Sequence, residues 1–330
     1  MGSMNKESSF KLLNVYMGGN FIDTANSYQN ESSEKFIREW MEKRQIRDQL
    51  VIATKYSIDF KIGDKSIQQR INYISNNAKS LHISVEASLK KLRTSYIDIL
   101  YLHFWDFDTS VEEVMDSLHN LVVSGKVIYL GISDTPAWIV SQANQYTKDH
   151  GKTPFDIYQG KWSILDRSFE LTLTPWSVVG GGKLYTDAEE QRRKETGKKG
   201  RDMGSGWERN EKEKVAKDID AKSITAVAIT YVMQKTPHVF PIISGRKVEN
   251  LVSNLEALDI SLSNELSQLP ILPASPVFSC PQLNSPTPYL QSAALTSPTR
   301  FRGNGGNELT RKFKRVRKSL SQNIIWSKCV

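Results

Sequence analysis

Four polar residues stand at or just after the ends of the first three β-branched runs of the chain. Asp23 lies near the end of the first run, and Tyr28 follows it in the next loop. Lys55 ends the second run and His103 follows the third. If these runs are parallel strands of a barrel, their carboxyl ends meet at the face where active sites of such barrels form. We therefore expect the four side chains to lie together.

Together these four residue types can deliver a proton. A tyrosine hydroxyl has a pKa of about 10 and is a weak acid at neutral pH. A neighbouring lysine ammonium stabilises the phenolate and lowers that pKa, and a carboxylate keeps the lysine charged when it is buried. A histidine can orient a carbonyl or share the proton. Taken singly, these residue types more often cap helices, pack in cores or meet solvent, so the hypothesis depends on their coming together.

The elements that must position these side chains alternate along residues 20–260. Short β-branched runs predict strands, and amphipathic runs between most of them predict helices. This alternation predicts parallel strands with helical crossovers. No Gly-x-Gly-x-x-Gly follows the first run, so a βα barrel is favoured over a doubly wound nucleotide-binding sheet. The predicted strands are 20–25, 50–55, 97–102, 127–132, 156–159, 171–174 and 239–243.

Two helix starts carry capping signals. Ser110 with Glu113 forms the pattern of a capping box, and Gly125 follows the end of that helical run. Thr135 is expected to cap the next helix, with Pro136 at its first position. Later helices are expected over 223–234 and around Val248 to Leu255.

The predicted barrel is incomplete. A (β/α)8 TIM-type barrel has eight strands, and the sequence supplies seven, because the stretch before Asn20 is too short for a strand and a helix. Only about ten residues separate Gln159 from Leu171, which is short for a crossover helix. The fold expected is therefore an α/β barrel that lacks its first strand and one internal crossover helix.

Composition divides the chain into two regions. The chain has 330 residues and a net charge of +8, and residues 301–330 hold eight basic residues and one acid. Seven of the twelve prolines fall between Pro270 and Pro298. We expect a barrel domain over 1–265 and a Pro/Ser-rich, then basic, disordered tail over 266–330. A nuclear-import signal or an anionic-surface patch is the alternative for the tail. Deletion of residues 270–330 is expected to leave the melting temperature nearly unchanged.

Other features exclude several protein classes. No apolar run approaches the length of a membrane helix, and residues 1–6 lack the apolar core of a secretory signal. Both cysteines, Cys280 and Cys329, lie in the tail, and no metal-ligand spacing is present. A cytoplasmic location is expected, with no membrane partner and no nucleic-acid partner for the nearly neutral barrel. No pattern indicates an oligomeric state.

Several motifs in order resemble the aldo-keto reductases, most closely the fungal aryl-alcohol dehydrogenase and norsolorinic-acid-reductase-like branch. The resemblance covers roughly residues 7–260. Its motifs are Gly18-Gly19-Asn20-Phe21-Ile22-Asp23-Thr24-Ala25-x-x-Tyr28, Ala53-Thr54-Lys55, Asp98-Ile99-Leu100-Tyr101-Leu102-His103, the segment Tyr129 to Trp138, Tyr158-Gln159-Gly160-Lys161-Trp162, the segment Pro175 to Lys183, and Gly245 to Leu251.

The resemblance implies an NADPH-dependent carbonyl reductase. Tyr28 would be the proton donor, with Asp23 and Lys55 tuning it and His103 placing the carbonyl. NADP(H) would be held by Ser133 and Gln159 at the nicotinamide carboxamide, although Asp134 stands where the family usually has Asn. The other implied cofactor contacts are Trp176 stacking on the nicotinamide, Ser177 at the pyrophosphate, Arg246 at the 2′-phosphate, and Gly245, Asn250 and Asn254 at the adenosine end.

Two functions remain open at this point. The first is an active NADPH-linked reductase of an aryl aldehyde or a polyketide-type ketone, acting on a small carbonyl substrate. The second is a catalytically impaired relative that binds the cofactor in a regulatory role or has no activity. The retained tetrad favours the first, and the missing barrel segments favour the second.

Overall fold

Seven strands and a succession of helices make up the part of the chain that the computed structural model describes. It describes residues 4–16, 19–163, 174–179, 191, 195, 223–235, 239–245, 247–263 and, as backbone alone, 325–327. The strands are β1 (Phe21–Asp23), β2 (Val51–Tyr56), β3 (Ile97–Leu102), β4 (Val127–Ser133), β5 (Ile157–Gln159), β6 (Ile242–Ile243) and β7 (Ile325–Ser327). The α-helices are α1 (Lys6–Val15), α2 (Ser32–Arg44), α3 (Ala78–Leu92), α4 (Val111–Val123), α5 (Ala137–Asp149), α8 (Ile224–Lys235) and α9 (Val248–Leu255).

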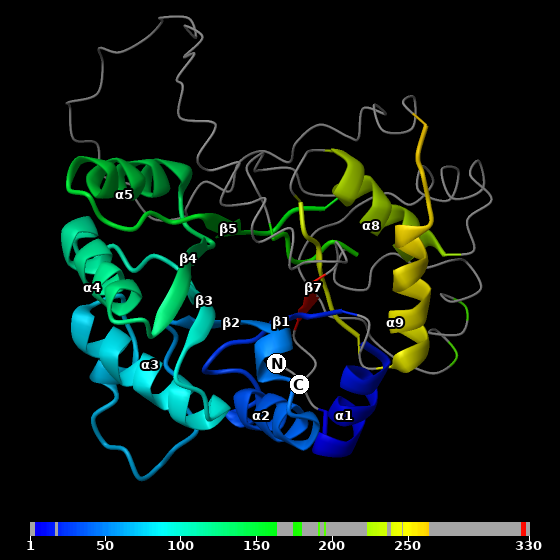
Figure 1. Cartoon of the computed structure of the whole chain (residues 1–330), viewed down its shortest axis with the longest axis horizontal. Coiled ribbons are helices and arrows are strands. Elements are labelled where there is room, and N and C mark those ends of the chain that lie inside the picture. The colour runs from blue at the N-terminus through cyan, green and yellow to red at the C-terminus, as the bar shows by residue number, and fades with distance from the viewer. Residues whose placement is uncertain are drawn as a thin grey trace, which may run out of the picture.

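All pairs in the sheet are parallel, and the sheet curls inside a layer of helices (Figure 1). The strand order is β5-β4-β3-β2-β1-β7-β6. The helices pack on their neighbours in a matching order, from α5 through α4, α3, α2 and α1 to α9 and α8. This arrangement follows from right-handed crossovers, each of which returns a helix to the same face of the sheet. The described residues therefore form a large part of a βα barrel, as the alternation predicts.

Two apolar clusters separate the two faces of the curled sheet. The larger lies between sheet and helices, and includes Ile22 and Ile52. The smaller lies inside the curl and consists mainly of Phe21, Ala53, Ile99, Tyr101, Ile157, Phe240 and Ile242. Alternate residues of a strand face opposite sides, so residues 21, 53, 99 and 101 point inward. By the same parity Asp23 and Lys55 belong to the interior of the barrel.

Register brings the inward residues into layers. Lys55 pairs with Tyr101, Tyr101 with Gly131, and Gly131 with Ile157 across four neighbouring strands. A Cβ atom on Gly131 would lie 2.4 Å from the Tyr101 ring, so this layer needs glycine beside its tyrosine. One layer further along the strands, Ser133 pairs with Gln159. The candidate site residues therefore occupy successive layers at the carboxyl ends of the strands.

The N-terminal ends of α4 and α5 differ in how far they follow the expected capping. Ser110 caps α4 by accepting from the Glu113 amide at 3.2 Å. The reciprocal half of the expected capping box is absent from the described contacts, because the Glu113 carboxylate accepts from the Ala78 amide instead. The expected Thr135 cap is wrong. Pro136 is the N-cap of α5, and the Thr135 hydroxyl donates to the Ser133 carbonyl.

Both ends of the described chain contain structure that composition does not predict. Helix α1 precedes β1, where the sequence indicates too little chain for a strand and a helix. Residues 325–327, inside the tail expected to be disordered, form β7 and pair with β1 and β6. For those three residues the expectation is wrong. The predicted strand at 171–174 lies outside the described residues except for Thr174, and both cysteines lie outside them as well.

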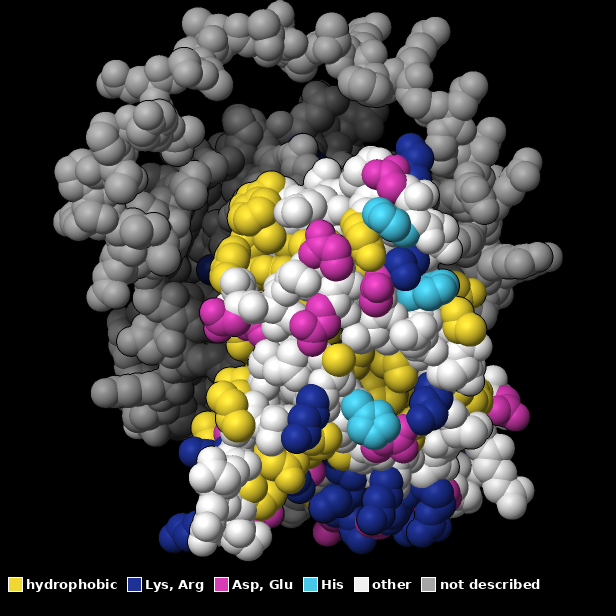
Figure 2. All heavy atoms as spheres, turned by 90° about the vertical axis from the view of Figure 1, so that its left-hand side faces the viewer, with side chains coloured by type: hydrophobic (Ala, Val, Ile, Leu, Met, Phe, Trp, Pro, Cys, Tyr) yellow, Lys and Arg dark blue, Asp and Glu magenta, His cyan; other side chains and the backbone are white. Residues whose placement is uncertain are grey.

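The outer surface over α3, α4 and α5 carries charges of both signs. Figure 2 shows basic side chains gathered at the lower edge of this face, with acidic and histidine side chains interspersed above them. Exposed apolar side chains on these elements and the loops beside them include Phe107, Val123 and Trp138. Among the described residues, none of the helices combines the length and apolar character needed to cross a membrane.

Candidate active site

A buried ion pair joins β1 to β2 at the carboxyl ends of the strands. Lys55 Nζ lies 2.5 Å from Asp23 Oδ2, and the two side chains are 0% and 1% exposed. The same ammonium donates to the Thr24 carbonyl at 2.7 Å. A buried charge is costly unless it is paired and hydrogen-bonded, and here both conditions are met. The structure thus places a charged lysine inside the barrel, as the sequence predicts.

Tyr28 and His103 complete the predicted group. Lys55 Nζ lies 5.3 Å from the centre of the Tyr28 ring. The Tyr28 and His103 rings meet edge to face, with centres 5.8 Å apart. Tyr28 is buried, whereas His103 is half-buried. All four residues predicted from strand ends are therefore brought together.

A second tyrosine lies near the same lysine but cannot play the same part. Lys55 Nζ is 5.6 Å from the centre of the Tyr101 ring. Tyr101 is fully buried, and its hydroxyl shares a 3.1 Å hydrogen bond with Thr174. Burial, and next the charge of Asp23, raise the pKa of Tyr101 well above its usual value. Tyr101 is thus a buried core residue and a weaker acid than an ordinary tyrosine, which leaves Tyr28 as the candidate donor.

Gln159 has a contact that sequence reasoning did not predict. Its Nε2 donates to Asp23 Oδ1 at 2.9 Å, so the two carboxylate oxygens of Asp23 are held by different partners. The alternation of side chains along β5 could have predicted it, because residues 157 and 159 share the inward face of the strand. Gln159 therefore connects the acid–base group to the residues expected to face a nicotinamide.

The predicted nicotinamide contacts lie next to one another. Ser133 and Gln159 are register partners on β4 and β5, and both are buried. Trp176 bonds through its amide to the Gly160 carbonyl at 3.0 Å, and its indole donates to Asp134 at 2.9 Å. Asp134 thus anchors the tryptophan, in the place where the family usually has Asn. A hydroxyl, a primary amide and a half-buried ring side by side fit a planar carboxamide-bearing ring.

The predicted adenosine-end residues are only partly described. Gly245 and Asn250 are neighbours, because a Cβ on Gly245 would lie 3.6 Å from that of Asn250. Asn254 is buried and accepts from Thr225 of α8 at 3.0 Å, so it ties two helices together. Ser177, the predicted pyrophosphate contact, has a left-handed backbone with φ of 63°. Arg246 lies outside the described residues.

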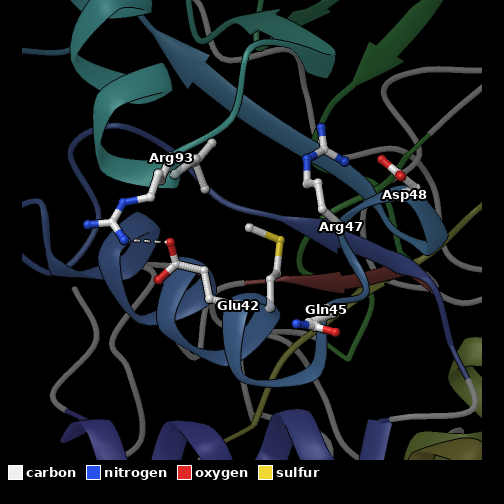
Figure 3. A pocket seen from close by; sticks show the side chains of 7 residues that line it. Glu42, Gln45, Arg47, Asp48 and Arg93 are labelled. Carbon is white, nitrogen blue, oxygen red and sulfur yellow. Dashed lines mark hydrogen bonds and ion pairs between the residues drawn. The ribbon is translucent and has the colours of Figure 1, made fainter.

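A surface pocket of about 310 Å³ lies at the other end of the sheet (Figure 3). Met41, Glu42, Gln45, Arg47, Asp48, Leu92 and Arg93 line it. Arg47 and Asp48 precede β2, and Leu92 and Arg93 precede β3, so the pocket adjoins the amino ends of these strands. It is separate from the group around Lys55.

Comparison with known proteins agrees with this geometry. The model of the aldo/keto reductase family matches residues 1–268. An aryl-alcohol dehydrogenase (NADP(+)) of Phanerodontia chrysosporium is 57% identical over 293 residues, covering 81% of this chain and 76% of its own. The aldo-keto reductase ausK of Emericella nidulans is 46% identical over 285 residues, covering 80% and 72%. A norsolorinic acid reductase of Aspergillus flavus is 46% identical over 284 residues, covering 80% and 71%.

The family match spans most of the chain and includes every residue of the buried acid–base group. Members of this family have the (β/α)8 barrel, which agrees with the curled parallel sheet. The chain belongs to the aldo/keto reductase family of oxidoreductases.

Proposed function

We propose that this chain reduces an aldehyde or ketone to the alcohol with NADPH, and that Tyr28 donates the proton. The observation that supports this most directly is the buried Lys55–Asp23 pair beside the Tyr28 ring, with His103 at the ring edge. Paired charges of this kind are costly to bury. Ionisable groups in such positions cluster at functional sites, where they adjust the pKa of a neighbouring acid.

The residues of the chain supply orientation and a proton. The His103 side chain orients the carbonyl oxygen toward the Tyr28 hydroxyl. As negative charge develops on that oxygen, the Tyr28 O–H bond breaks and the proton passes to it. The Lys55 ammonium, held by Asp23, stabilises the phenolate that remains. A bound reduced nicotinamide supplies the hydride that the carbonyl carbon receives.

The residues expected at the cofactor would each contact a different part of it. Ser133 and Gln159 would hold the carboxamide, and Trp176 would cover one face of the ring. Because Gln159 also donates to Asp23 at 2.9 Å, carboxamide binding and the acid–base group would share one side chain. Ser177 and the Gly245–Asn254 segment would take the phosphates and adenosine, with Arg246 favouring NADP(H) over NAD(H).

We propose an aromatic carbonyl as the substrate class. The names of the Phanerodontia chrysosporium and Aspergillus flavus relatives, an aryl-alcohol dehydrogenase and a norsolorinic acid reductase, support it. The test is the rate of NADPH consumption with benzaldehyde, with heptanal as an aliphatic aldehyde of equal carbon number. A higher kcat/KM for benzaldehyde supports the aromatic class, and a higher value for heptanal contradicts it.

Cofactor titration separates the two functions that the sequence leaves open. We expect quenching of tryptophan fluorescence by NADPH at lower concentration than by NADH. NADPH binding without turnover of any carbonyl would favour the regulatory alternative. Equal affinity for both cofactors would contradict the role assigned to Arg246.

A further inference from the structure

The loop that carries Tyr28 has an unusual backbone. It joins β1 to α2, and three consecutive residues in it, Gln29, Asn30 and Glu31, have φ of 50°, 52° and 67°. Left-handed backbone is unfavourable for each residue with a Cβ atom. A run of three persists only where the surroundings hold it. The position of the Tyr28 hydroxyl therefore depends on what holds this loop.

A buried ion pair lies behind the loop. Lys91 of α3 places Nζ 2.8 Å from Glu34 Oε2 of α2, and their side chains are 8% and 0% exposed. The same ammonium donates to the Asn26 carbonyl at 2.9 Å, two residues before Tyr28. It also lies 3.4 Å from Glu31 Oε2, at the end of the left-handed run. One ammonium thus contacts the loop before and after Tyr28.

The pair is also tied to the strand that carries Lys55. The Thr54 hydroxyl donates to Glu34 Oε1 at 2.7 Å. The backbone N–H of Asn26 donates to the Lys55 carbonyl at 3.2 Å. Glu34 therefore connects the Tyr28 loop to the residue just before Lys55, and the acid and its charged neighbour are held by the same network.

Further contacts close this region from solvent. Phe60 is buried, and its ring has Lys91 Nζ at 5.1 Å and Lys61 Nζ at 5.3 Å from its centre. Lys61 Nζ in turn lies 2.6 Å from Glu31 Oε1. Lys91 and Glu34 lie in a low-dielectric setting, so their attraction is strong and their geometry is restricted. Lys61 and Glu31, at 23% and 16% exposed, border on solvent.

From these contacts we propose that Glu34 and Lys91 are positioning residues that hold the Tyr28 hydroxyl at the reacting carbonyl. Replacing a buried ion pair by neutral side chains of similar volume often costs little stability. Its retention here is explained by geometry: the ammonium fixes two points of the Tyr28 loop at once. This proposal rests on the proposed function for its kinetic consequence, but not for its structural one.

The main experiment removes both charges together. In Glu34→Gln/Lys91→Met the glutamine can still accept from Thr54, and no buried charge is left unpaired. We expect a melting temperature and an NADPH Kd close to those of the wild type. We expect kcat to fall by about 10²-fold, the order produced by displacing a reacting group by about 1 Å. KM should change much less than kcat.

Hydrogen exchange supplies a measurement that needs neither cofactor nor substrate. The amides of residues 24–33 should exchange faster in Glu34→Gln/Lys91→Met, while those of β3 keep their wild-type rates. A double variant with wild-type kcat and wild-type loop exchange would overturn the proposal. A wild type without carbonyl reductase activity would overturn the proposed function, and the exchange result would still decide the role of the pair.

Two further variants serve as a fallback test of the network and as a control. If the double variant does not fold, Glu31→Gln tests the same network, because Glu31 is half-buried and contacts both Lys91 and Lys61. It should lower kcat several-fold and speed loop exchange, and unchanged values for both would count against the network. Glu42→Gln/Arg93→Met is the matched control. Its 2.9 Å pair also joins α2 to the end of α3, but it lies at the pocket of Figure 3 and should leave both measurements unchanged.

Discussion

An aspartate-containing ion pair lies at each end of the sheet, one at β2 and β3 and the other joining β1 to β2. At the amino ends, Arg47 lies 2.8 Å from Asp98, and the side chains are 18% and 14% exposed. At the carboxyl ends, Lys55 lies 2.5 Å from Asp23, with both side chains fully buried. Arg47 also donates to the Leu50 and Tyr96 carbonyls and stacks on the Tyr96 ring. Lys55 instead sits beside the rings of Tyr28 and Tyr101.

The neighbours of each pair distinguish structure from chemistry. The Arg47 guanidinium donates to the backbone carbonyls just before β2 and β3, so it fixes the positions at which these two strands begin. Both cations lie against a tyrosine ring, but the Tyr96 hydroxyl beside Arg47 donates to the Asp48 carboxylate. Tyr28, beside Lys55, instead has the His103 imidazole at the edge of its ring. An ion pair at a strand end is thus common to both regions, and only the carboxyl-end pair is placed to act on an acid.

The largest effect is expected for Tyr28→Phe. The hydroxyl is needed when the alkoxide forms, so kcat should fall by about 10²–10⁴-fold while NADPH affinity stays nearly unchanged. Carbonyl reduction and a fluorescence titration measure the two quantities. Full activity in this variant would show that another group donates the proton.

Lys55→Met should reduce kcat to a comparable degree and also destabilise the fold. It leaves the Asp23 carboxylate buried and unpaired, which typically costs about 3–5 kcal/mol. Asp23→Asn/Lys55→Met should recover much of that stability but none of the activity. Denaturant unfolding and turnover assays check both parts, and recovered activity in the double variant would contradict a role for the ammonium.

The other flank of β1 offers a third test, because β7 pairs with it through Ile22↔Trp326 and Asp23↔Ser327. Trp326→Pro removes a backbone donor from the strand that pairs with β1 and β6. It should cost about 1–3 kcal/mol, with a lower kcat because Asp23 is on a neighbouring strand. Deletion of residues 270–330, which composition predicts to leave the melting temperature nearly unchanged, would remove β7 and tests the same pairing. Ser292→Pro, in the proline-rich stretch, is the control and should behave as the wild type.

Arg47→Met should reduce the stability of the amino end of the sheet without affecting catalysis. Losing its ion pair and carbonyl contacts should cost about 1–2 kcal/mol, reduced from the buried case by partial exposure. The kcat should stay at the wild-type value. A loss of kcat without a loss of stability would mean that the two ends of the sheet are not independent.

The smallest effects concern pH, and they have opposite signs at the two ends of β3. Burial, only partly offset by Arg47, raises the pKa of Asp98 above its ordinary 3.8. Its contribution to stability is present below pH 3.8 and is lost as pH rises through the raised pKa. At the other end, burial acts to raise the pKa of Asp106, but hydrogen bonds from Asn76, Ser75 and Thr109 outweigh it and lower the value.

The Asp106 contribution is therefore present above pH 3.8 and is lost as pH falls through the lowered pKa. As pH rises through the acid range, the loss in the free energy of unfolding caused by Asp98→Asn should become smaller. The loss caused by Asp106→Asn should become larger. Denaturant unfolding at several pH values measures both slopes. Parallel slopes would contradict the environments described for these two aspartates.

Sequence patterns predicted the strands that carry the site because those strands are local and strongly marked. The bounds predicted for β3, 97–102, match the structure. Asp23, Tyr28, Lys55 and His103 could be placed because parallel strands bring their carboxyl ends together. The roles assigned to them come from the resemblance and stay predictions. Residue type and position along the chain were sufficient to predict that the four side chains lie together.

The missed features depend on contacts between distant segments. The Gln159–Asp23 bond joins residues 136 positions apart, and the Lys91–Asn26 contact joins residues 65 apart. No local pattern distinguishes Lys91 from a solvated helix lysine, and only packing buries it. Strand β7 was missed because a run of three residues, Ile325–Ser327, is too short to stand out in a polar tail.

The place of β7 in the sheet has a consequence for biosynthesis. Residues 21–23 form early in translation, but their partner at 325–327 is made some 300 positions later. At about 5–20 residues per second, β1 waits on the order of 15–60 s for this neighbour. During that time the flank of β1 presents unpaired backbone groups, which is the kind of edge that chaperones shield and that seeds aggregation. The yield of folded chain should therefore depend on translation speed and chaperone supply more than that of a barrel whose first and last strands are separated by fewer residues.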